Sequence, residues 1–228
     1  MNKPDPKPKL WYLENFKILS VLSPPEKERL SEMVMMKQPD KREIIRFSND
    51  STNKIYFVKA GKVKISKYSE NGQEIILSIL GPGEIFGELA IAGQSDSDEV
   101  AEIVENAIIC ELKLDDMAKM LDMNPQFNLQ ITKLIGFKFK KIQGRLESLF
   151  FKNAPDRIKE IIKELASEHG EKLLNSEISV KLNLTHEDIA KLTATTRQTV
   201  TSVFNELEKQ GIIKYNRKQI LIKDHSKL

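Results

Sequence analysis

The hydrophobic pattern divides the chain into a β-rich segment and helical segments on either side of it. Between residues 40 and 113, short runs of β-branched and aromatic residues alternate with turn residues, and Val63 and Ile65 alternate with lysines. This period-two alternation is typical of a strand with one buried face. Asn71-Gly72 separates two such runs and is a strong hairpin signal. Many short strands with regular turns predict an antiparallel barrel or jelly roll.

Two segments outside the strands have helical spacing. Residues 24–36 follow a proline start and predict a short helix. Residues 124–150 place apolar side chains at alternating spacings of four and three, which is a heptad-like seam. From spacing alone, this helix either packs on its own domain or pairs with its twin across a dimer axis. The seam consists of Ile135, Phe139, Ile142, Leu146 and Leu149.

Chain breaks suggest an α+β protein with four parts. Residues 1–13 are rich in proline and lysine, and we expect a flexible tail there. Asn153-Ala154-Pro155 interrupts the long helical pattern and marks a domain boundary. After it we expect a helix at about residues 156–168 ended by His169-Gly170, with Gly170 in the left-handed cap position, and then a short strand. The expected parts are therefore 1–13, a β-roll domain at 14–123, a long helix at 124–150 and a C-terminal domain at 151–228.

The C-terminal domain contains two short helices joined by a tight turn. Thr185-x-x-Asp188 predicts a capping box at the start of the first helix, and Thr195-x-x-Gln198 predicts a second one. Thr193-Ala194-Thr195 forms the turn, and Gly211 has the usual position after a helix end. Two short helices with such a turn match the helix-turn-helix, whose second helix enters the major groove of DNA.

The exposed side chains of the second helix suit base recognition. Arginine can bond guanine through two acceptors, and glutamine can do the same with adenine. After Gly211 comes a β-hairpin, or wing, with a basic tip that would contact phosphates. Each feature also has a purely structural interpretation, since Gln198 could close its own capping box and a basic tip is often only solvated. The combination predicts DNA contacts from Thr185, Thr196, Arg197, Gln198, Thr201, Ser202, Arg217 and Lys218.

Composition adds limits on compartment and partners. The formal net charge is +3, and residues 151–228 carry all of this excess, with 14 basic and 11 acidic residues. An excess of this size agrees with DNA binding without proving it. The lone Cys110 excludes an internal disulfide and a four-cysteine iron–sulfur cluster, and it fits a reducing cytoplasm. No apolar run has the length of a membrane span, and we expect neither a secretory signal nor membrane association.

Three segments carry a family resemblance. IAKLTATTRQTVTSVFNELEKQGII, GPGEIFGEL and NPQFNLQITKL resemble the cyclic-AMP receptor protein/fumarate–nitrate regulator (CRP/FNR) superfamily, over nearly all of residues 14–222. The resemblance implies a cyclic-nucleotide-binding-like β-roll, a long dimerisation helix and a winged helix-turn-helix. It also implies a homodimer on near-palindromic double-stranded DNA and contact with RNA polymerase. Ser202 stands where many members have a second base-reading arginine, which puts the usual operator sequence in doubt.

The effector pocket implied by the resemblance departs from the pattern. In cyclic-nucleotide-binding members a Gly-Glu-Leu motif grips the ribose, and an arginine about ten residues later pairs with the phosphate. Here Asp98 occupies the arginine position, and Ile142 falls near the adenine contact. Since a carboxylate repels a phosphate and isoleucine cannot donate a hydrogen bond, we expect cyclic AMP to bind weakly or not at all. The candidate effector residues are Gly87, Glu88, Leu89, Asp98, Glu99, Ile142 and Gln143.

Several alternatives stay open for the effector and for the class of protein. The effector is a different small ligand, a cation drawn to the acidic segment, or absent; we favour no ligand or an unidentified small molecule. A metal enzyme of the jelly-roll type would need histidines in the barrel, and His169, His186 and His225 all lie outside the β-rich segment. We therefore expect no metal site and no enzymatic activity. A ligand-binding module acting on a protein partner is a second alternative, against which the winged C-terminus argues.

Overall fold

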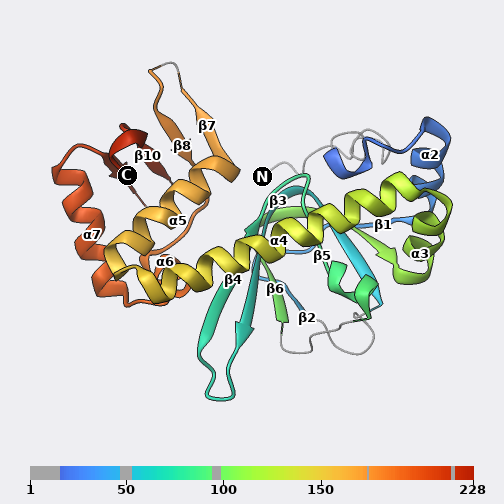
Figure 1. Cartoon of the computed structure of the whole chain (residues 1–228), viewed down its shortest axis with the longest axis horizontal. Helices are drawn as coiled ribbons and strands as arrows, with labels where there is room; N and C mark the ends of the chain where they lie inside the picture. The colour runs from blue at the N-terminus through green and yellow to red at the C-terminus, as the bar shows by residue number, and fades with distance from the viewer. Residues whose placement is uncertain (1–15, 47–52, 94–98, 174, 217–218) are drawn as a thin grey trace. The chain divides into compact units, whose positions relative to one another are not determined.

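The computed structural model describes residues 16–46, 53–93, 99–173, 175–216 and 219–228, and these form two compact units (Figure 1). The first unit contains the described residues up to Lys67 and those of Ile79–Lys141. The second contains Tyr68–Ser78 and the described residues of Ile142–Leu228. The expected tail at residues 1–13 lies outside the described residues.

An antiparallel sheet is the centre of the first unit. Its strands are β1 (Met35–Lys37), β2 (Ile44–Arg46), β3 (Lys54–Tyr68), β4 (Glu74–Leu80), β5 (Ile85–Phe86) and β6 (Glu99–Lys113), and the first residues of β4 belong to the second unit. The strand order is β1-β6-β3-β4, with β2 paired to β6 and β5 paired to β3. The antiparallel β-rich prediction for this part of the chain is confirmed.

A glycine allows the two longest strands to bend. The register between β3 and β6 shifts at three places from Val58 to Val63. Gly61 lies in this stretch with φ +75°, and a Cβ on it would collide with the backbone oxygen of Asn106. Both the positive φ and the close approach require glycine. Shifts of this kind bend a strand and increase its twist, which lets a sheet curve into a roll.

Helices close the first unit. Besides the sheet, the first unit contains the 3-10 helices η1 (Lys17–Leu19) and η2 (Glu88–Ala92) and the helices α2 (Pro24–Met33) and α3 (Leu114–Met123). Phe16, Leu30, Phe57 and Phe127 are buried together in its core. The helix expected over residues 24–36 ends earlier, at Met33. The last residues of that run form β1 opposite Ile109–Glu111 of β6, because sheet pairing overrides the helix propensity of methionine.

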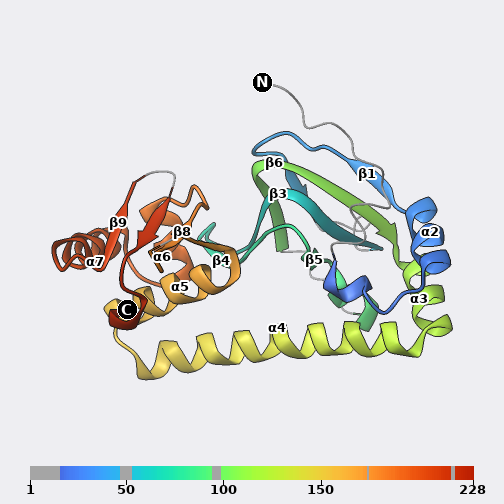
Figure 2. The ribbon, with the colours of Figure 1, turned by 90° about the horizontal axis from the view of Figure 1, so that it is seen from above.

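The long helix α4 (Pro125–Phe151) is continuous over 27 residues (Figure 2). Its bounds are within one residue of the expected segment 124–150. The expected break follows it, since Asn153 accepts a hydrogen bond from the backbone N–H of Asp156 and caps the next helix. The passage from the first unit to the second lies inside α4, between Lys141 and Ile142, and not at the break.

The second unit combines helices with a small antiparallel sheet. Its elements after α4 are α5 (Ala154–His169), β7 (Gly170–Lys172), β8 (Ile178–Val180), α6 (His186–Thr193), α7 (Arg197–Lys209), β9 (Ile213–Tyr215), β10 (Ile220–Ile222) and η3 (His225–Lys227). The sheet order is β7-β8-β10-β9. Gly170 was expected in a left-handed cap but has φ −79° and begins β7. Glycine is needed there because a Cβ would collide with the carbonyl of Ala166 and the side chain of Ile178.

Candidate DNA-binding surface and effector pocket

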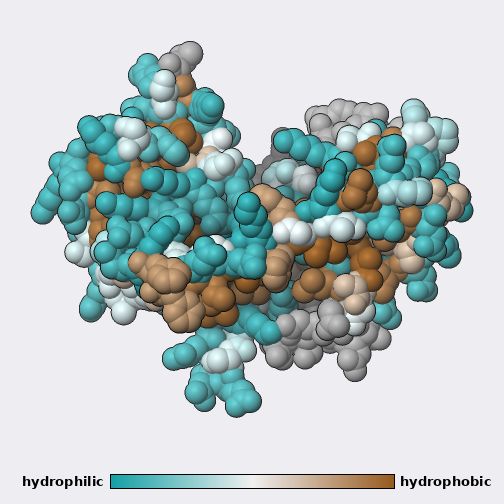
Figure 3. Space-filling view, viewed as in Figure 1, coloured by the Kyte–Doolittle hydropathy of each residue, from teal (hydrophilic) through white to brown (hydrophobic). Residues whose placement is uncertain are grey.

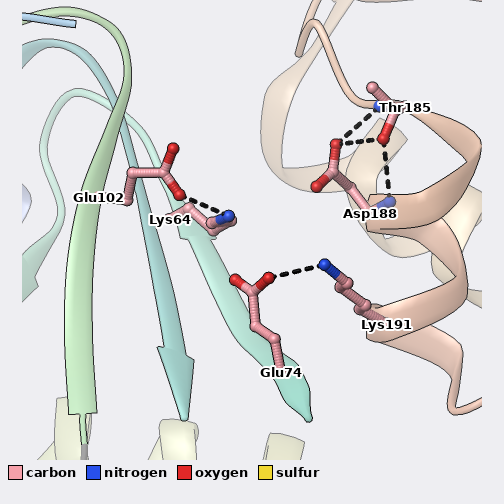
Figure 4. Close-up of polar contacts among 6 residues, drawn as sticks. All are labelled: Lys64, Glu74, Glu102, Thr185, Asp188 and Lys191. Atoms are coloured by element: carbon pink, nitrogen blue, oxygen red, sulfur yellow. Dashed lines mark hydrogen bonds and ion pairs between the residues drawn. The ribbon is translucent and has the colours of Figure 1, made fainter. Parts of the chain in front are cut away.

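Helices α6 and α7 form the helix-turn-helix that the sequence predicts. Thr185 and Asp188 make a complete capping box at the start of α6, with the Thr185 N–H 2.8 Å from the Asp188 carboxylate (Figure 4). The aspartate is therefore long enough for this role. Ala194 ends α6 in the left-handed region, at φ 48°. The second predicted box is wrong: Thr196, not Thr195, is the N-cap of α7, and its side chain accepts the N–H of Thr199.

The capping box gives a measurable contribution to stability. Asp188→Ala removes the acceptor for both the Thr185 N–H and the Thr185 hydroxyl. We expect the free energy of unfolding to fall by about 1 kcal/mol, the usual cost of losing a helix cap. Glu187→Ala is the matched control, because it removes the same charge from the same turn. Urea unfolding followed by circular dichroism measures the difference, and equal losses in both variants would contradict the role of the box.

The two sides of α7 have different environments. Val200, Val203, Phe204 and Leu207 are buried. The polar face of α7, defined as Arg197, Gln198, Thr201, Ser202 and Asn205, lies on the other side, where only Thr201 is half-buried and the rest are exposed. The structure therefore brings four of the predicted DNA-contacting residues onto one surface. Thr185 and Thr196 directly precede α6 and α7 and are their N-caps.

Arg157 holds the turn between the two helices, a role that the sequence pattern did not indicate. Its Nε donates to the carbonyl of Thr193 at 2.9 Å, and its Nη2 donates to the carbonyl of Ala194 at 3.1 Å. Its Nη1 donates to the carbonyl of Lys152, just after α4, at 2.9 Å. One guanidinium therefore links the end of α4 to the C-terminus of α6, where a positive charge is also favourable. Only its place at the start of α5 was visible in the sequence.

The wing is present as the hairpin of β9 and β10. Tyr215 in β9 donates its hydroxyl to Asn205 of α7 at 3.0 Å, and its ring packs edge-on against Phe204 at 5.1 Å. These contacts fix the wing against α7. The predicted phosphate contacts Arg217 and Lys218 lie outside the described residues.

One ion pair and one hydrogen bond from an arginine connect the hairpin Tyr68–Ser78 to the rest of the second unit. Glu74, whose side chain is 9% exposed, pairs with Lys191 of α6 at 2.7 Å (Figure 4). Arg145 of α4 donates to the carbonyl of Leu77 and pairs with Glu164 of α5 at 2.8 Å. The hairpin is thus attached to both α4 and the first helix of the helix-turn-helix.

The candidate effector pocket has its glutamate already paired. Gly87 adopts φ 81° and starts η2, which places Glu88 in a buried position. The Lys138 ammonium of α4 lies 2.8 Å from Glu88 Oε1 and 2.8 Å from the carbonyl of Ile85. The negative charge of Glu88 is therefore balanced within the protein. The sequence pattern did not indicate this contact, because the partner of Lys138 lies 50 positions earlier in the chain.

The remaining effector candidates belong to different elements of the chain. Leu89 is 40% exposed and Glu99 begins β6. Asp98, on which the cyclic-AMP expectation depends most, lies outside the described residues. Ile142 and Gln143 are exposed on the part of α4 that belongs to the second unit. The structure therefore groups Gly87, Glu88 and Leu89 as neighbours and adds Lys138 to them.

An apolar stripe covers one side of α4 (Figure 3). Ile135 packs partly against the core of the first unit. The other four seam residues are exposed, at 60% for Phe139, 63% for Ile142, 54% for Leu146 and 46% for Leu149. Phe150 extends the stripe and is 77% exposed. A contiguous exposed apolar surface of this kind marks an interaction site.

Two family models match the chain, one over the part with most of the candidate effector residues and one over the part with the candidate DNA-binding residues. The cyclic nucleotide-binding domain matches residues 37–124, and the Crp-like helix-turn-helix domain matches residues 156–228. The "CRP-like cAMP-activated global transcriptional regulator" of Mycobacterium tuberculosis is 26% identical over 176 residues, which cover 77% of this chain and 78% of that protein. The "Anaerobic regulatory protein" of Haemophilus influenzae is 28% identical over 204 residues, covering 89% and 79%. The chain belongs to the CRP/FNR family.

Solved structures of CRP/FNR proteins have the same fold. A CooA mutant from Carboxydothermus hydrogenoformans has a TM-score of 0.76 at 27% identity and covers 93% of this chain and 94% of its own. FixK2 from Bradyrhizobium japonicum has a TM-score of 0.75 at 18% identity and covers 85% of this chain and 94% of its own, which is similarity of fold alone. The resemblance and the α+β fold predicted from the sequence are both confirmed.

Membership in the CRP/FNR family settles the class of protein. Its members are transcription regulators, so the expectation of a non-enzymatic regulator is confirmed. Within the part of the chain that the structure describes, no helix is both long enough and apolar enough to cross a bilayer. Among the same residues, no three histidine, cysteine or acidic side chains are placed to hold a metal ion.

Proposed function

We propose that this CRP/FNR protein is a homodimer that binds a near-palindromic operator and regulates transcription without requiring cyclic AMP. The polar face of α7 carries the DNA-binding part of the proposal. It presents an arginine and a glutamine in the first turn of the second helix, where a recognition helix meets base edges. Two copies related by a two-fold axis would read half-sites about 10 bp apart.

The apolar stripe of α4 supports the homodimer. Four exposed seam residues at heptad spacing suit a parallel pairing of two α4 helices, in which each apolar side chain packs between those of the other copy. A symmetric dimer uses the same surface twice, so a single stripe is sufficient. Contact with RNA polymerase is proposed from family membership, and a cytoplasmic location from the lone, buried Cys110, which fits a reducing compartment.

Independence from cyclic AMP rests on charge. At about 4 Å, a carboxylate and a phosphate repel by about 4 kcal/mol in a surface-like dielectric, where an arginine would attract by the same amount. Asp98 stands in the sequence where the resemblance implies the phosphate-binding arginine and would provide repulsion of this kind, and Asp96 would add to it. Lys138 does not supply the missing cation for a phosphate, because its charge is balanced by Glu88. The exposed Ile142 offers no hydrogen bond to an adenine.

A regulator that responds to another small ligand is the second candidate. The match to the cyclic nucleotide-binding domain and the ordered Glu88–Lys138 pair favour it. A ligand with its own donor and acceptor could bond this pair without bringing a phosphate near Asp98. A module that acts on a protein partner would need no polar face on α7, so we place it third.

Selection from a random duplex pool, with and without cyclic AMP at fixed physiological salt, tests the proposal. We expect the same near-palindrome in both arms. A palindrome found only with cyclic AMP would keep the regulator and overturn the effector assignment. Lack of enrichment in both arms, followed by enrichment when cell metabolites are added, would favour the second candidate. Lack of enrichment in every arm would overturn DNA recognition.

Removing the first-turn side chains of α7 should abolish specificity. Arg197→Ala and Gln198→Ala should each lower affinity for the selected operator by about 10- to 100-fold, since one bidentate base contact contributes about 1–3 kcal/mol. Gln198→Ala changes no charge, so its affinity for unrelated DNA should stay unchanged. Lys209→Ala, at the far end of α7, is the matched control for the lost charge. Electrophoretic mobility shift titrations distinguish these cases, and a Lys209→Ala loss equal to that of Arg197→Ala would contradict base reading.

A further inference from the structure

The hydroxyl of Thr201 on the polar face of α7 is engaged by two groups of the protein itself. It lies 2.9 Å from the carbonyl oxygen of Arg197, one turn earlier in α7. It also lies 2.8 Å from Nδ1 of His186, the first residue of α6. Thr201 is half-buried, while Arg197, Gln198 and Ser202 beside it are exposed. The N-cap hydroxyls of Thr185 and Thr196 also make two hydrogen bonds each, but both lie within their own capping turns, whereas Thr201 is held by its own helix and by α6.

Counting hydrogens fixes the direction of both bonds. A threonine hydroxyl has one hydrogen and can accept through two lone pairs. The Arg197 carbonyl is only an acceptor, so the hydroxyl hydrogen must lie between these two oxygens at their separation of 2.9 Å. His186 Nδ1 must then carry a hydrogen and donate to Thr201. The Thr201 hydroxyl consequently has no hydrogen left to give to a base.

The imidazole that makes this bond is held in place from three sides. The rings of Phe204 and Tyr215 lie 5.0 and 5.1 Å from the His186 ring. Thr185, directly before it, is fixed in the capping box. Burial and the positive charge of Arg197 both lower the pKa of His186, which favours the neutral ring, and the count of hydrogens places its single hydrogen on Nδ1. His186 therefore restrains the rotation of Thr201 about its Cα–Cβ bond.

The major groove offers few partners to a side chain in this state. Guanine O6 and N7, adenine N7 and thymine O4 are all acceptors and need a donor. The hydroxyl keeps one lone pair, which only the amino groups of adenine and cytosine could use. Toward bases that offer acceptors Thr201 presents its methyl group, and threonine methyls make apolar contacts with the 5-methyl of thymine. We propose that Thr201 reads a thymine through its methyl group and that His186 is the positioning residue that fixes it. This inference rests on the proposed function, because it requires α7 in the major groove.

Deoxyuridine provides the test, since it differs from thymidine only by the 5-methyl group. Each thymine of a selected half-site is replaced singly by deoxyuridine, and the affinity of the full-length protein is measured at fixed salt. We expect one position to lose affinity about three- to fivefold, the size of burying one methyl group. Thr201→Val keeps the methyl and should keep this loss. Thr201→Ser keeps the hydroxyl and should bind both duplexes equally.

A second pair of variants tests His186. His186→Ala should reduce the deoxyuridine effect by freeing Thr201 to rotate, with affinity for unrelated DNA unchanged. His186→Asn places an amide donor near the position of Nδ1 and should restore the effect, which a purely packing role would not predict. The inference is overturned if no deoxyuridine position weakens wild-type binding, if Thr201→Ser retains the loss, or if adenine or cytosine is selected opposite Thr201. Failure to select any operator would instead overturn the proposed function.

Discussion

Leu146→Asp should convert the protein to monomers and lower its affinity for the operator by about 100-fold or more, the gain that comes from joining two half-site contacts. Leu146 lies in the middle of the exposed part of the α4 stripe and is 54% exposed. In a symmetric dimer one substitution places two carboxylates in the same seam. Each would be buried without a partner, at a cost of several kcal/mol. Sedimentation velocity measures the mass, and titration of a labelled operator measures the affinity.

Gly144→Asp is the matched control for this prediction. It adds the same charge two residues away, which is about 200° around the helix from Leu146. A Cβ at Gly144 would meet nothing within 4 Å, so the aspartate can be accommodated. We expect this variant to remain dimeric and to bind the operator normally. A dimeric Leu146→Asp protein with full affinity would show that the seam is not the interface.

Arg157→Ala should destabilise the second unit by about 2–3 kcal/mol, because three carbonyls lose a charged donor. Losing the hydrogen bonds of Arg157 should also weaken operator binding by about tenfold, since the carbonyls of Thr193 and Ala194 belong to the turn that sets the angle of α7. Arg157→Lys keeps the charge but not the planar fork, and it should have an intermediate stability. Chemical unfolding monitored by circular dichroism gives the first quantity, and operator titration gives the second.

Lys163→Ala controls for the charge removed from α5. Lys163 is exposed on the same helix, and we expect little change in stability from a surface lysine. If Lys163→Ala and Arg157→Ala lose the same stability, the three hydrogen bonds of Arg157 contribute nothing beyond charge. If Arg157→Ala is destabilised but binds the operator with unaltered affinity, Arg157 stabilises the second unit without setting the angle of α7.

The sequence predicted mainly those features that depend on residues close together in the chain. The heptad spacing located α4 to within one residue, because a long apolar period is a strong signal. The capping box at Thr185 was predicted correctly because it requires only residues three positions apart. The start of α7 was placed one residue early, since Thr195 and Thr196 are both good caps and the sequence alone does not distinguish them. Gly170 was correctly predicted to end α5, but it is needed there for close packing against Ala166 and Ile178 and not for a left-handed turn.

Contacts between distant residues were not accessible from the pattern. Lys138 meets Glu88 across 50 positions, and Arg157 meets Thr193 across 36. Neither partner is specified by periodicity, capping or turn chemistry. The double engagement of Thr201 was hidden for the same reason, because it depends on a histidine 15 positions earlier. The sequence therefore predicted which residues form the surface of α7, and the structure added how one of them is restrained.

The hairpin Tyr68–Ser78 has a consequence for dividing the protein into fragments. Because it belongs to the second unit, the backbone passes between the units at three places, after Lys67, after Ser78 and after Lys141. A single protease cut in α4 would leave the two units joined through β3 and β4. An expressed fragment starting at Ile142 would lack Glu74, a partner of Lys191, and Leu77, a partner of Arg145. A fragment that keeps these contacts would therefore have to contain both Tyr68–Ser78 and Ile142–Leu228 in one chain, although these two segments are not adjacent in the sequence.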